Sequence, residues 1–232
     1  MTQNIRHHHI LNNNVPSSRR SACARCARPI RTCICAHIRP TQNIVELLIL
    51  QHPQEVTNAK NTLGLLALSL KNSQTLIGED FSPKDLHEAL YADHLQPILL
   101  YPATAEDKAM GLQSPAVLTH ADMQRPETLR LVVIDGTWRK SRKMLYVNPE
   151  LQSLPRLSLD ATPVSIYTIR KAHQENQLST LEASCYALQQ LEAQHSNYTH
   201  LLAAFTDFVA QQAAFTPAAH LHSKSTRDPE SL

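Results

Sequence analysis

An acid, a glycine, a threonine and the only tryptophan of the chain stand together at residues 135–138, in the stretch V-V-I-D-G-T-W-R-K-S-R-K-M-L. Asp135 directly follows an aliphatic run, and a carboxylate at the end of a buried strand can serve as a general base. Trp138 precedes a group of cations, and an aromatic side chain beside cations can stack on a base while the cations bind phosphates. Taken together, these features indicate a site, which none of them would do alone. The simpler alternatives are a capping aspartate, a core tryptophan and a solvated charged face made of Arg139, Lys140, Arg142 and Lys143.

Three further predictions follow from the same stretch. Gly136 permits a sharp turn or the close approach of a ligand. Thr137 can cap the helix that we expect to follow it. On that helix Arg139, Arg142 and Lys143 share one face, where three like charges repel each other. We therefore expect a polyanion such as an RNA backbone to lie against this face.

Four of the five cysteines form a cluster, C-A-R-C-A-R-P-I-R-T-C-I-C. Two close pairs joined by a short loop can place four thiolates around Zn²⁺, and a site closed by four protein ligands is structural. An iron–sulfur cluster and free thiols are the alternatives. The arginines between the cysteines predict either a basic knuckle that binds RNA or ordinary surface charge. The metal ligands would be Cys23, Cys26, Cys33 and Cys35, and the arginines are Arg25, Arg28 and Arg31.

The composition limits the classes of protein to which the chain can belong. A chain of 232 residues with 42% hydrophobic residues suits one medium-sized domain with a substantial core. The net charge of +2 confines any contact with nucleic acid to local patches. Neither a membrane-length apolar run nor a signal-peptide pattern is present, so we expect a reduced cytoplasmic setting and no membrane partner. Only four glycines occur, and none belongs to a Rossmann or P-loop motif, which argues against those nucleotide sites.

Apolar runs alternate with helical patterns along the chain. Strands are expected at 43–50, 75–78, 97–102, 130–135, 155–159 and 165–169, and helices at 57–71, 82–94, 138–146, 179–194 and 198–215. This alternation predicts an α/β domain with a mainly parallel sheet, in which ligands bind beyond the carboxyl ends of the strands. The expected organisation is a disordered arm at 1–20, a zinc knuckle at 21–40, a catalytic domain at 41–215 and a disordered tail at 216–232.

Five motifs together carry a resemblance to a known family. They are C-x2-C-x-R-P-x3-C-x-C from residue 23, Q-H-P-x-E at 51–55, L-L-Y-P at 99–102, D-G-T-W at 135–138 and S-T-L-E-A at 179–183. In this order the motifs resemble the DTW-domain family, whose characterised members are tRNA-uridine aminocarboxypropyltransferases. The resemblance implies a SPOUT-like α/β domain with a C-terminal trefoil knot that binds S-adenosylmethionine. It also implies transfer of the 3-amino-3-carboxypropyl group to N3 of a uridine, at position 47 of tRNA, with release of methylthioadenosine.

The resemblance and the chemistry of the side chains then suggest roles for individual residues. Asp135 is the candidate base, and Thr137 and Trp138 would complete the catalytic group. The alternative explanation of S-T-L-E is a capping box. The alternative for His52 is a histidine with a purely structural role. A silent zinc-containing RNA-binding module and a SPOUT-type tRNA methyltransferase are the alternative functions, and the oligomeric state stays open. Candidate cofactor contacts are Leu100, Tyr101, Pro102, Gly136, Ser179, Thr180 and Glu182, and further candidate tRNA contacts are His52, Arg170 and Lys171.

Overall fold

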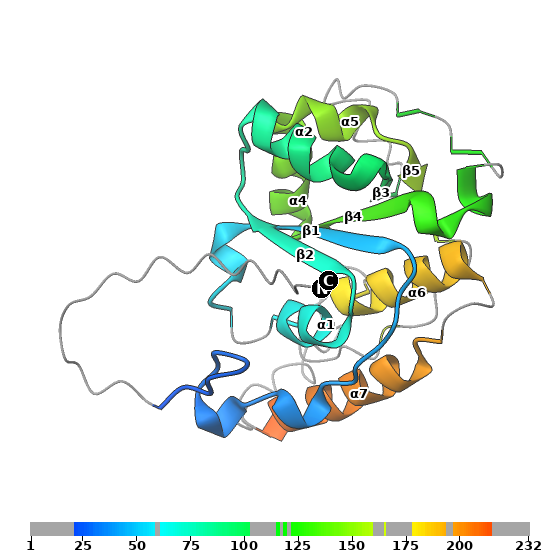
Figure 1. The fold of residues 1–232 in the computed structure, drawn as a ribbon. Helices are drawn as coiled ribbons and strands as arrows, with labels where there is room; N and C mark the ends of the chain where they lie inside the picture. The colour runs from blue at the N-terminus through cyan, green and yellow to red at the C-terminus, as the bar shows by residue number, and fades with distance from the viewer. Residues whose placement is uncertain are drawn as a thin grey trace, which may run out of the picture.

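A computed structural model describes residues 21–58, 61–102, 115–116, 118–119, 122–159, 165, 178–193 and 197–214. In this part of the chain a five-stranded sheet lies between two layers of helices (Figure 1). All of its described strand pairs are parallel, as expected, and the strand order is β2-β1-β4-β3-β5. The expected arm at 1–20, the expected tail at 216–232, Arg170 and Lys171 lie outside the described residues. The strands are β1 Glu46–Gln51, β2 Ser73–Ile77, β3 Gln96–Leu100, β4 Leu129–Asp135 and β5 Arg156–Leu157.

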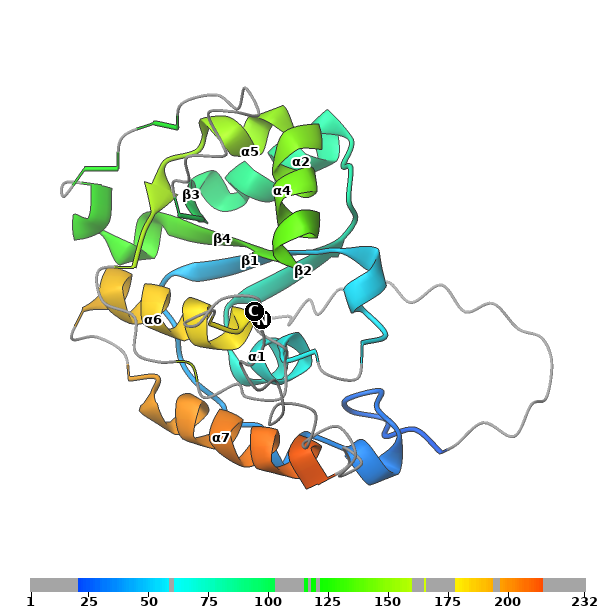
Figure 2. The same ribbon diagram turned by 180° about the vertical axis from the view of Figure 1, so that it is seen from behind.

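The helices divide between the two faces of the sheet. Helices α2, α4 and α5 cover one face, whereas α1 and α6 cover the other and α7 packs beyond them (Figures 1 and 2). None of the described helices has the length and apolar character needed to cross a membrane. The helices are α1 Leu63–Ser69, α2 Pro83–Tyr91, α4 Trp138–Val147, α5 Pro149–Ser153, α6 Thr180–Glu192 and α7 Thr199–Ala214, with short 3₁₀ turns such as η2 Cys35–His37 and η3 Pro53–Glu55.

The predicted elements differ from the observed ones mainly at their ends. The helix predicted at 57–71 begins only at Leu63, because Pro53–Glu55 form a separate 3₁₀ turn and the Asn61 side chain accepts a hydrogen bond from the Leu63 N–H. Helix α5 was not predicted. It starts at Pro149, which lacks the N–H that a continuing helix needs but fits the first position of a new one. The strand predicted at 155–159 is reduced to Arg156–Leu157.

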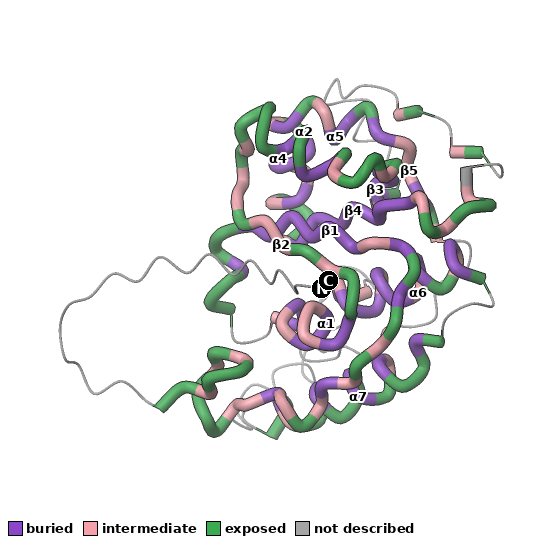
Figure 3. The backbone as a smooth tube through the Cα atoms, in the orientation of Figure 1, coloured by how far each residue is buried: buried purple, intermediate pink, exposed green. Residues whose placement is uncertain are grey.

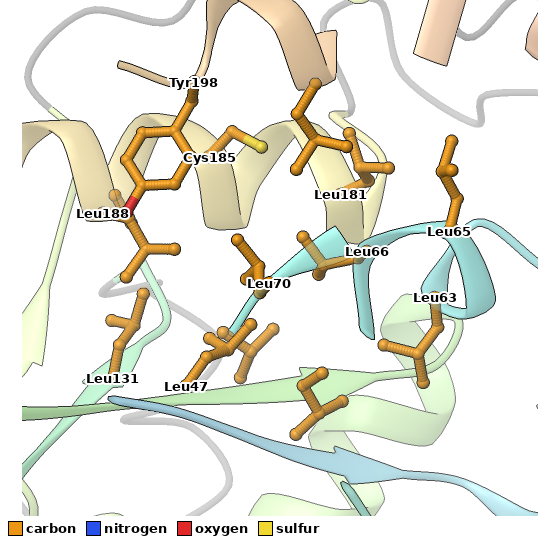
Figure 4. Packing of buried hydrophobic residues seen from close by; sticks show 14 of the residues in the cluster. Leu47, Leu63, Leu65, Leu66, Leu70, Leu131, Leu181, Cys185, Leu188 and Tyr198 are labelled. Atoms are coloured by element: carbon orange, nitrogen blue, oxygen red, sulfur yellow. The ribbon is translucent and has the colours of Figure 1, made fainter. Parts of the chain in front are cut away.

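Both faces of the sheet are buried, which explains the continuous aliphatic runs of β1 and β4. Successive side chains point to opposite faces, so Leu47 and Ile49 join the core under α1, α6 and α7, while Leu48 and Leu50 join the core under α2, α4 and α5. Every residue of β4 is buried (Figure 3). Figure 4 shows the first of these cores, where the side chain of Cys185 packs among leucines as a small hydrophobic residue.

A buried arginine joins β4 to the end of α2. Arg130 is 1% exposed, and its Nη1 donates to the carbonyl oxygens of Ala89 and Leu90 at 2.6 and 2.9 Å. Its Nη2 lies 2.9 Å from a carboxylate oxygen of Glu46 on β1. A guanidinium satisfies the last carbonyls of a helix and opposes the negative end of the helix dipole. This contact therefore holds α2 on the sheet.

A buried glutamate at the end of α6 anchors that helix to the chain entering β1. Glu192 is fully buried, and its Oε1 accepts the backbone N–H groups of Ile44 and Val45 at 2.8 and 2.9 Å. Its Oε2 accepts the hydroxyl of Tyr198 at 2.9 Å. Both oxygens of this buried side chain thus have hydrogen-bond donors, which a polar group in an apolar core needs.

Candidate functional site

The candidate site lies at the carboxyl edge of the sheet, where β1 and β4 end side by side. Gln51 is paired in register with Asp135, and the backbone N–H of His52 donates to the carbonyl oxygen of Asp135 at 3.0 Å. From β1 the chain continues to β2 on one side of this pair, and then crosses to β3 on the other side. Such a reversal opens a crevice at the strand ends, which is where ligands bind in open α/β sheets.

Three neutral groups hold the carboxylate of Asp135, which is 6% exposed. The hydroxyl of Thr180 donates to Oδ1 at 2.6 Å, while the side-chain amides of Gln51 and Asn61 donate to Oδ2 at 3.1 and 3.4 Å. The interpretation of Asp135 as a capping residue is wrong, because the cap of α4 is Thr137, whose hydroxyl accepts from the N–H of Lys140. Asp135 is instead the point where three distant segments meet.

Two of these partners had no role in the prediction from sequence. Gln51 opens the Q-H-P-x-E motif, and its position at the last residue of a strand beside β4 could have suggested the contact. Asn61 gave no such signal, because it stood inside a predicted helix. In the structure it precedes α1 and faces Asp135.

The S-T-L-E-A segment begins α6 with the capping box that its spacing allows. The hydroxyl of Ser179 accepts the N–H of Glu182 at 3.2 Å, and a carboxylate oxygen of Glu182 accepts the N–H of Ser179 at 2.8 Å. The hydroxyl of Ser165 donates to the same oxygen at 2.8 Å. The side chains of Ser179 and Glu182 are therefore used to start the helix, and Thr180 is the member of the motif that reaches Asp135.

Trp138 lies at the surface beside Tyr101 of the L-L-Y-P motif. The two rings meet edge to face with centroids 5.8 Å apart, and the guanidinium of Arg156 lies 5.3 Å from the centre of the Tyr101 ring. Trp138 is 39% exposed, so the interpretation of it as a core anchor is wrong. Leu100 is half-buried and Pro102 is exposed, on either side of the buried Tyr101. The two motifs thus form an aromatic pair with one accessible ring.

The cations of α4 separate into two kinds. Lys140 is paired with Glu55 and Lys143 with Glu79, each at 2.7 Å, so acidic partners relieve part of the repulsion that we expected an RNA to relieve. The Lys140–Glu55 pair is largely buried, whereas Lys143 is exposed. The sequence analysis missed both glutamates as partners, although Glu55 ends the Q-H-P-x-E motif.

The two arginines of α4 have no acidic partner within the described residues. Arg139 and Arg142 line an open hollow of about 380 Å³ together with Lys143 and Tyr146, which confirms that the cations at 139, 142 and 143 share a face. Tyr146 is 56% exposed and was not predicted to belong to this face. The hollow combines cationic side chains with an aromatic ring.

His52 is used within the fold. Its Nδ1 accepts the backbone N–H of Gln54 at 3.1 Å, so the proton of the neutral ring is on Nε2, which faces a carboxylate oxygen of Glu79 at 3.0 Å. Hydrogen bonds from Lys143 and then His52 lower the pKa of Glu79 below its ordinary value. Both ring nitrogens of His52 are engaged and its side chain is 7% exposed, which favours the structural alternative for this histidine.

Gly136 is surrounded by protein atoms at the turn from β4 into α4. A Cβ at this position would lie 3.2 Å from the Cβ of Lys140 and 3.7 Å from the Cβ of His52. The position fits the expected sharp turn, because a side chain here would push against the first turn of α4. The expected close approach of a ligand stays a prediction.

The four clustered cysteines have the geometry of a site for one metal ion. The Sγ atoms of Cys23 and Cys35 are 3.6 Å apart, those of Cys26 and Cys33 are 3.7 Å apart, and all four lie within 4.8 Å of one another. Tetrahedral coordination with metal–sulfur bonds of about 2.3 Å would separate the sulfurs by about 3.8 Å. The set thus fits a single ion, whereas in an iron–sulfur cluster the four cysteine sulfurs are divided among two or four irons.

The ionisation of these thiols is uneven. Backbone N–H groups of Cys26 and Arg25 lower the pKa of Cys23 to about 6. Desolvation and the neighbouring thiols raise the pKa of Cys35 to about 12. Four thiols this close cannot all ionise without a cation among them, and a bound metal ion would supply that charge.

The arginines of the knuckle also differ from one another. Arg25 and Arg31 are exposed, but Arg28 is half-buried and points into the molecule. Its Nη2 donates to the backbone oxygen of Asn61 at 2.5 Å, and its guanidinium lies 5.4 Å from the centre of the Phe208 ring. Arg28 is therefore engaged within the fold, whereas Arg25 and Arg31 face solvent.

The sheet, the polar edge and the four-thiol cluster together define a parallel α/β domain with a basic surface beside a buried acid. The model of the DTW domain matches residues 20–213, and the chain belongs to this family, as its motifs indicated. A mouse protein named tRNA-uridine aminocarboxypropyltransferase 2 is 33% identical over 183 residues, which cover 76% of this chain and 58% of the mouse protein. The Drosophila melanogaster protein of the same name is 32% identical over 185 residues, 77% of this chain and 69% of its own.

A plant relative is similar over a shorter stretch. Arabidopsis thaliana tRNA-uridine aminocarboxypropyltransferase A is 31% identical over 135 residues, 55% of this chain and 51% of its own length. The chain thus spans between about half and two thirds of the curated relatives described here. No solved structure matches the chain significantly.

Proposed function

We propose that this chain transfers the 3-amino-3-carboxypropyl group of S-adenosylmethionine to N3 of uridine 47 in tRNA and releases methylthioadenosine. The proposal depends mainly on one observation, which is that three family motifs meet at one carboxylate. Gln51 of Q-H-P-x-E and Thr180 of S-T-L-E-A both donate hydrogen bonds to Asp135 of D-G-T-W at the edge of the sheet. The names of the matched relatives support the same class of reaction. A simple RNA-binding module would not need a buried acid held in this way.

Asp135 is the group that we assign to the proton of the uridine imide. An ionised carboxylate has about four lone-pair sites, and the described donors occupy three of them, which leaves room for the N3–H of the base. The bond from N3 to the γ-carbon forms as the carbon–sulfur bond breaks and the proton passes to the carboxylate. The sulfonium leaves as a neutral thioether, so its departure needs no acid. Thr180, Gln51 and Asn61 would keep Asp135 oriented, and orientation is a large part of the rate in such sites.

The aromatic pair suggests how the reactants are held beside Asp135. The exposed ring of Trp138 offers a face for the uracil or the adenine, and Tyr101 supports that ring from the side. Thr137 would shape the site by fixing the start of α4. The side chains of Ser179 and Glu182 would act indirectly, through the start of α6. The cofactor contacts that we propose are Leu100, Tyr101, Pro102, Gly136 and Thr180, while Ser179 and Glu182 would support the cofactor site only through the start of α6.

The tRNA backbone is proposed to lie along α4. Arg139 and Arg142 are the main contacts in this proposal, because no acid among the described residues neutralises them, and Lys143 can join them from its exposed ion pair. Arg25 and Arg31 would extend the surface at the knuckle. Contacts by Arg170 and Lys171 stay predictions.

Three further parts of the proposal concern the setting of the reaction. We propose a SPOUT-like knot as the S-adenosylmethionine site; the parallel sheet and the lack of a glycine-rich nucleotide motif are compatible with it, and the residues from 166 to 177 lie outside the described part of the chain. Zinc is the proposed ion of the four-cysteine cluster, where it would be structural because four protein ligands close its coordination. A tRNA substrate and clustered thiols favour a cytoplasmic location.

The test uses a tRNA transcript with uridine at position 47 and the same transcript with cytidine there. Each is incubated with the full chain and S-adenosylmethionine labelled in the carboxyl carbon, and in parallel with cofactor labelled in the methyl group. The proposal expects carboxyl label in the uridine transcript and none in the cytidine transcript. Methyl label in tRNA would indicate a methyltransferase instead, and tRNA binding without transfer of either label would indicate a silent binding module.

A further inference from the structure

We propose that the four-cysteine knuckle positions Asp135, through Arg28 and Asn61, so that metal binding at the surface stabilises the geometry of the reaction site. The effect on catalysis rests on the function proposed above, whereas the structural link does not. The proposal gives Arg28 a different task from Arg25 and Arg31, with which it was grouped as an RNA contact.

The first link joins the knuckle to the loop before α1. Inside the knuckle, the backbone oxygen of Arg28 accepts the N–H of Cys23 at 2.8 Å, so the position of the arginine depends on the cysteine turn. Its side chain leaves the knuckle and donates to the backbone oxygen of Asn61 at 2.5 Å, with the ring of Phe208 close to its guanidinium. A charged donor on a carbonyl makes a stronger hydrogen bond than a neutral donor.

The second link joins Asn61 to the acid. The Oδ1 of Asn61 accepts the N–H of Leu63 at 2.6 Å and so fixes the start of α1. Its Nδ2 donates to the backbone oxygen of Glu55 at 2.8 Å and to Asp135 at 3.4 Å. The contact with Asp135 is near the upper limit of a hydrogen bond, so a small displacement of the loop would break it. The carboxylate would then keep Thr180 and Gln51 but lose one of its three restraints.

The rest of the knuckle is packed firmly enough to transmit this restraint. Ile34 and Ile38 are buried in the core beside α1 and α7, and the Cδ1 of Ile34 lies 3.5 Å from where a Cβ on Gly64 would be. The side-chain amide of Gln211 on α7 donates to the backbone oxygen of Cys33 at 3.3 Å. The second cysteine pair, Cys33 and Cys35, is thereby attached to the body of the protein. In our proposal a metal ion joins the first pair, Cys23 and Cys26, to it and so fixes the segment that carries Arg28.

The experiment uses the full zinc-loaded chain and compares Arg28→Gln with Arg125→Gln. Both variants lose one positive charge, but Arg125 is an exposed residue whose described ion pair is with its neighbour Glu127. Three quantities are measured: kcat for transfer, the dissociation constant for tRNA, and hydrogen–deuterium exchange in the peptide from residue 51 to 66. For Arg28→Gln we expect kcat to fall roughly ten-fold, since small displacements in a reaction site have effects of this size or larger. We expect tRNA affinity to stay within about two-fold, and exchange in that peptide to rise.

The exchange measurement also tests the role of the metal. Chelation of zinc from the wild-type chain should raise exchange in the same peptide to the level of Arg28→Gln, and should raise it little further in the variant. Weaker tRNA binding by Arg28→Gln with unchanged kcat and exchange would overturn the proposal and return Arg28 to the RNA surface. If the wild-type chain transfers nothing, the proposed function fails, and the exchange results still decide the structural link.

A second variant tests the link without altering the knuckle. Asn61→Asp keeps an acceptor for the Leu63 N–H but replaces the donor beside Asp135 with a negatively charged oxygen. A like charge raises the pKa of a neighbouring carboxyl. The acid limb of the kcat–pH profile should therefore move to higher pH, which a purely structural change would not produce. An unmoved acid limb in a folded variant would contradict the contact between Asn61 and Asp135.

Discussion

Removing Arg139 and Arg142 from α4 should change how tRNA binding responds to salt. Each phosphate that a protein neutralises releases counterions, so the logarithm of the binding constant falls with the logarithm of the salt concentration by about 0.9 per phosphate on a duplex and about 0.7 on a single strand. Arg139 and Arg142 line the same hollow, and neither has an acidic partner among the described residues. If each arginine neutralises one phosphate, the slope of the Arg139→Gln/Arg142→Gln double variant should be smaller than that of the wild-type chain by about 1.4 to 1.8.

The measurement is a salt titration of tRNA binding, followed by filter binding or fluorescence anisotropy. A double variant that loses Lys84 and Arg125 removes the same charge from exposed positions on other segments, and its slope should equal that of the wild-type chain. Lys140→Gln gives a useful contrast. It leaves the buried carboxylate of Glu55 without its ion pair, so it should lower stability more than it changes the slope.

Two outcomes would refute the reasoning. If the double arginine variant binds tRNA with an unchanged salt slope, then α4 does not lie on the RNA backbone and the unpaired charges are a solvated face. A slope that falls equally in the control variant would mean that only the net charge matters.

Three other predictions follow from single contacts. Asp135→Asn should reduce transfer about 10²- to 10⁴-fold without unfolding the chain, as loss of a general base does, and full activity in a labelled-cofactor assay would exclude that role. Tyr198→Phe removes the hydroxyl from buried Glu192 and should lower the free energy of unfolding by about 1–3 kcal/mol in urea titrations; no measurable loss would mean that this hydrogen bond contributes little. Because Lys143 lowers the pKa of Glu79, the stability from this carboxylate is complete above its ordinary pKa of 4.5 and is lost as the pH falls below it. Thermal melts of Glu79→Gln should therefore vary less with pH in that acid range than those of the wild-type chain, and identical pH curves would contradict the ion pair.

Much of the fold follows from local patterns in the chain. The run from Leu129 to Asp135 is aliphatic because β4 is buried on both faces, and such a run indicates a strand without knowledge of its neighbours. The start of α6 could be predicted from Ser179 and Glu182 alone, since a capping box involves residues only three apart. The same holds for Thr137 at the start of α4.

The partners of the site could not be found in this way. Gln51 and Thr180 are 84 and 45 positions from Asp135, and the glutamates that pair with α4 are equally remote from it in sequence. The order of the strands and their register decide which of these side chains meet. Neither can be inferred from residue periodicity. The cations of α4 illustrate the consequence, because the sequence does not show which of the four have acidic partners, and in the structure Lys140 and Lys143 are paired with acids.

The sequence by itself therefore determined the family, the positions of the main strands and helices, the four thiols and the edge of the sheet where Asp135 stands. Those features depend on residues that are close together in the chain or on motifs that can be recognised in the sequence alone. Tertiary structure alone decided that Thr180, Gln51 and Asn61 hold the acid, that Trp138 is accessible, and that Arg28 faces inward. Such contacts arise when β1 and β4 pair and α6 docks against them, and this packing brings together side chains that no local rule connects.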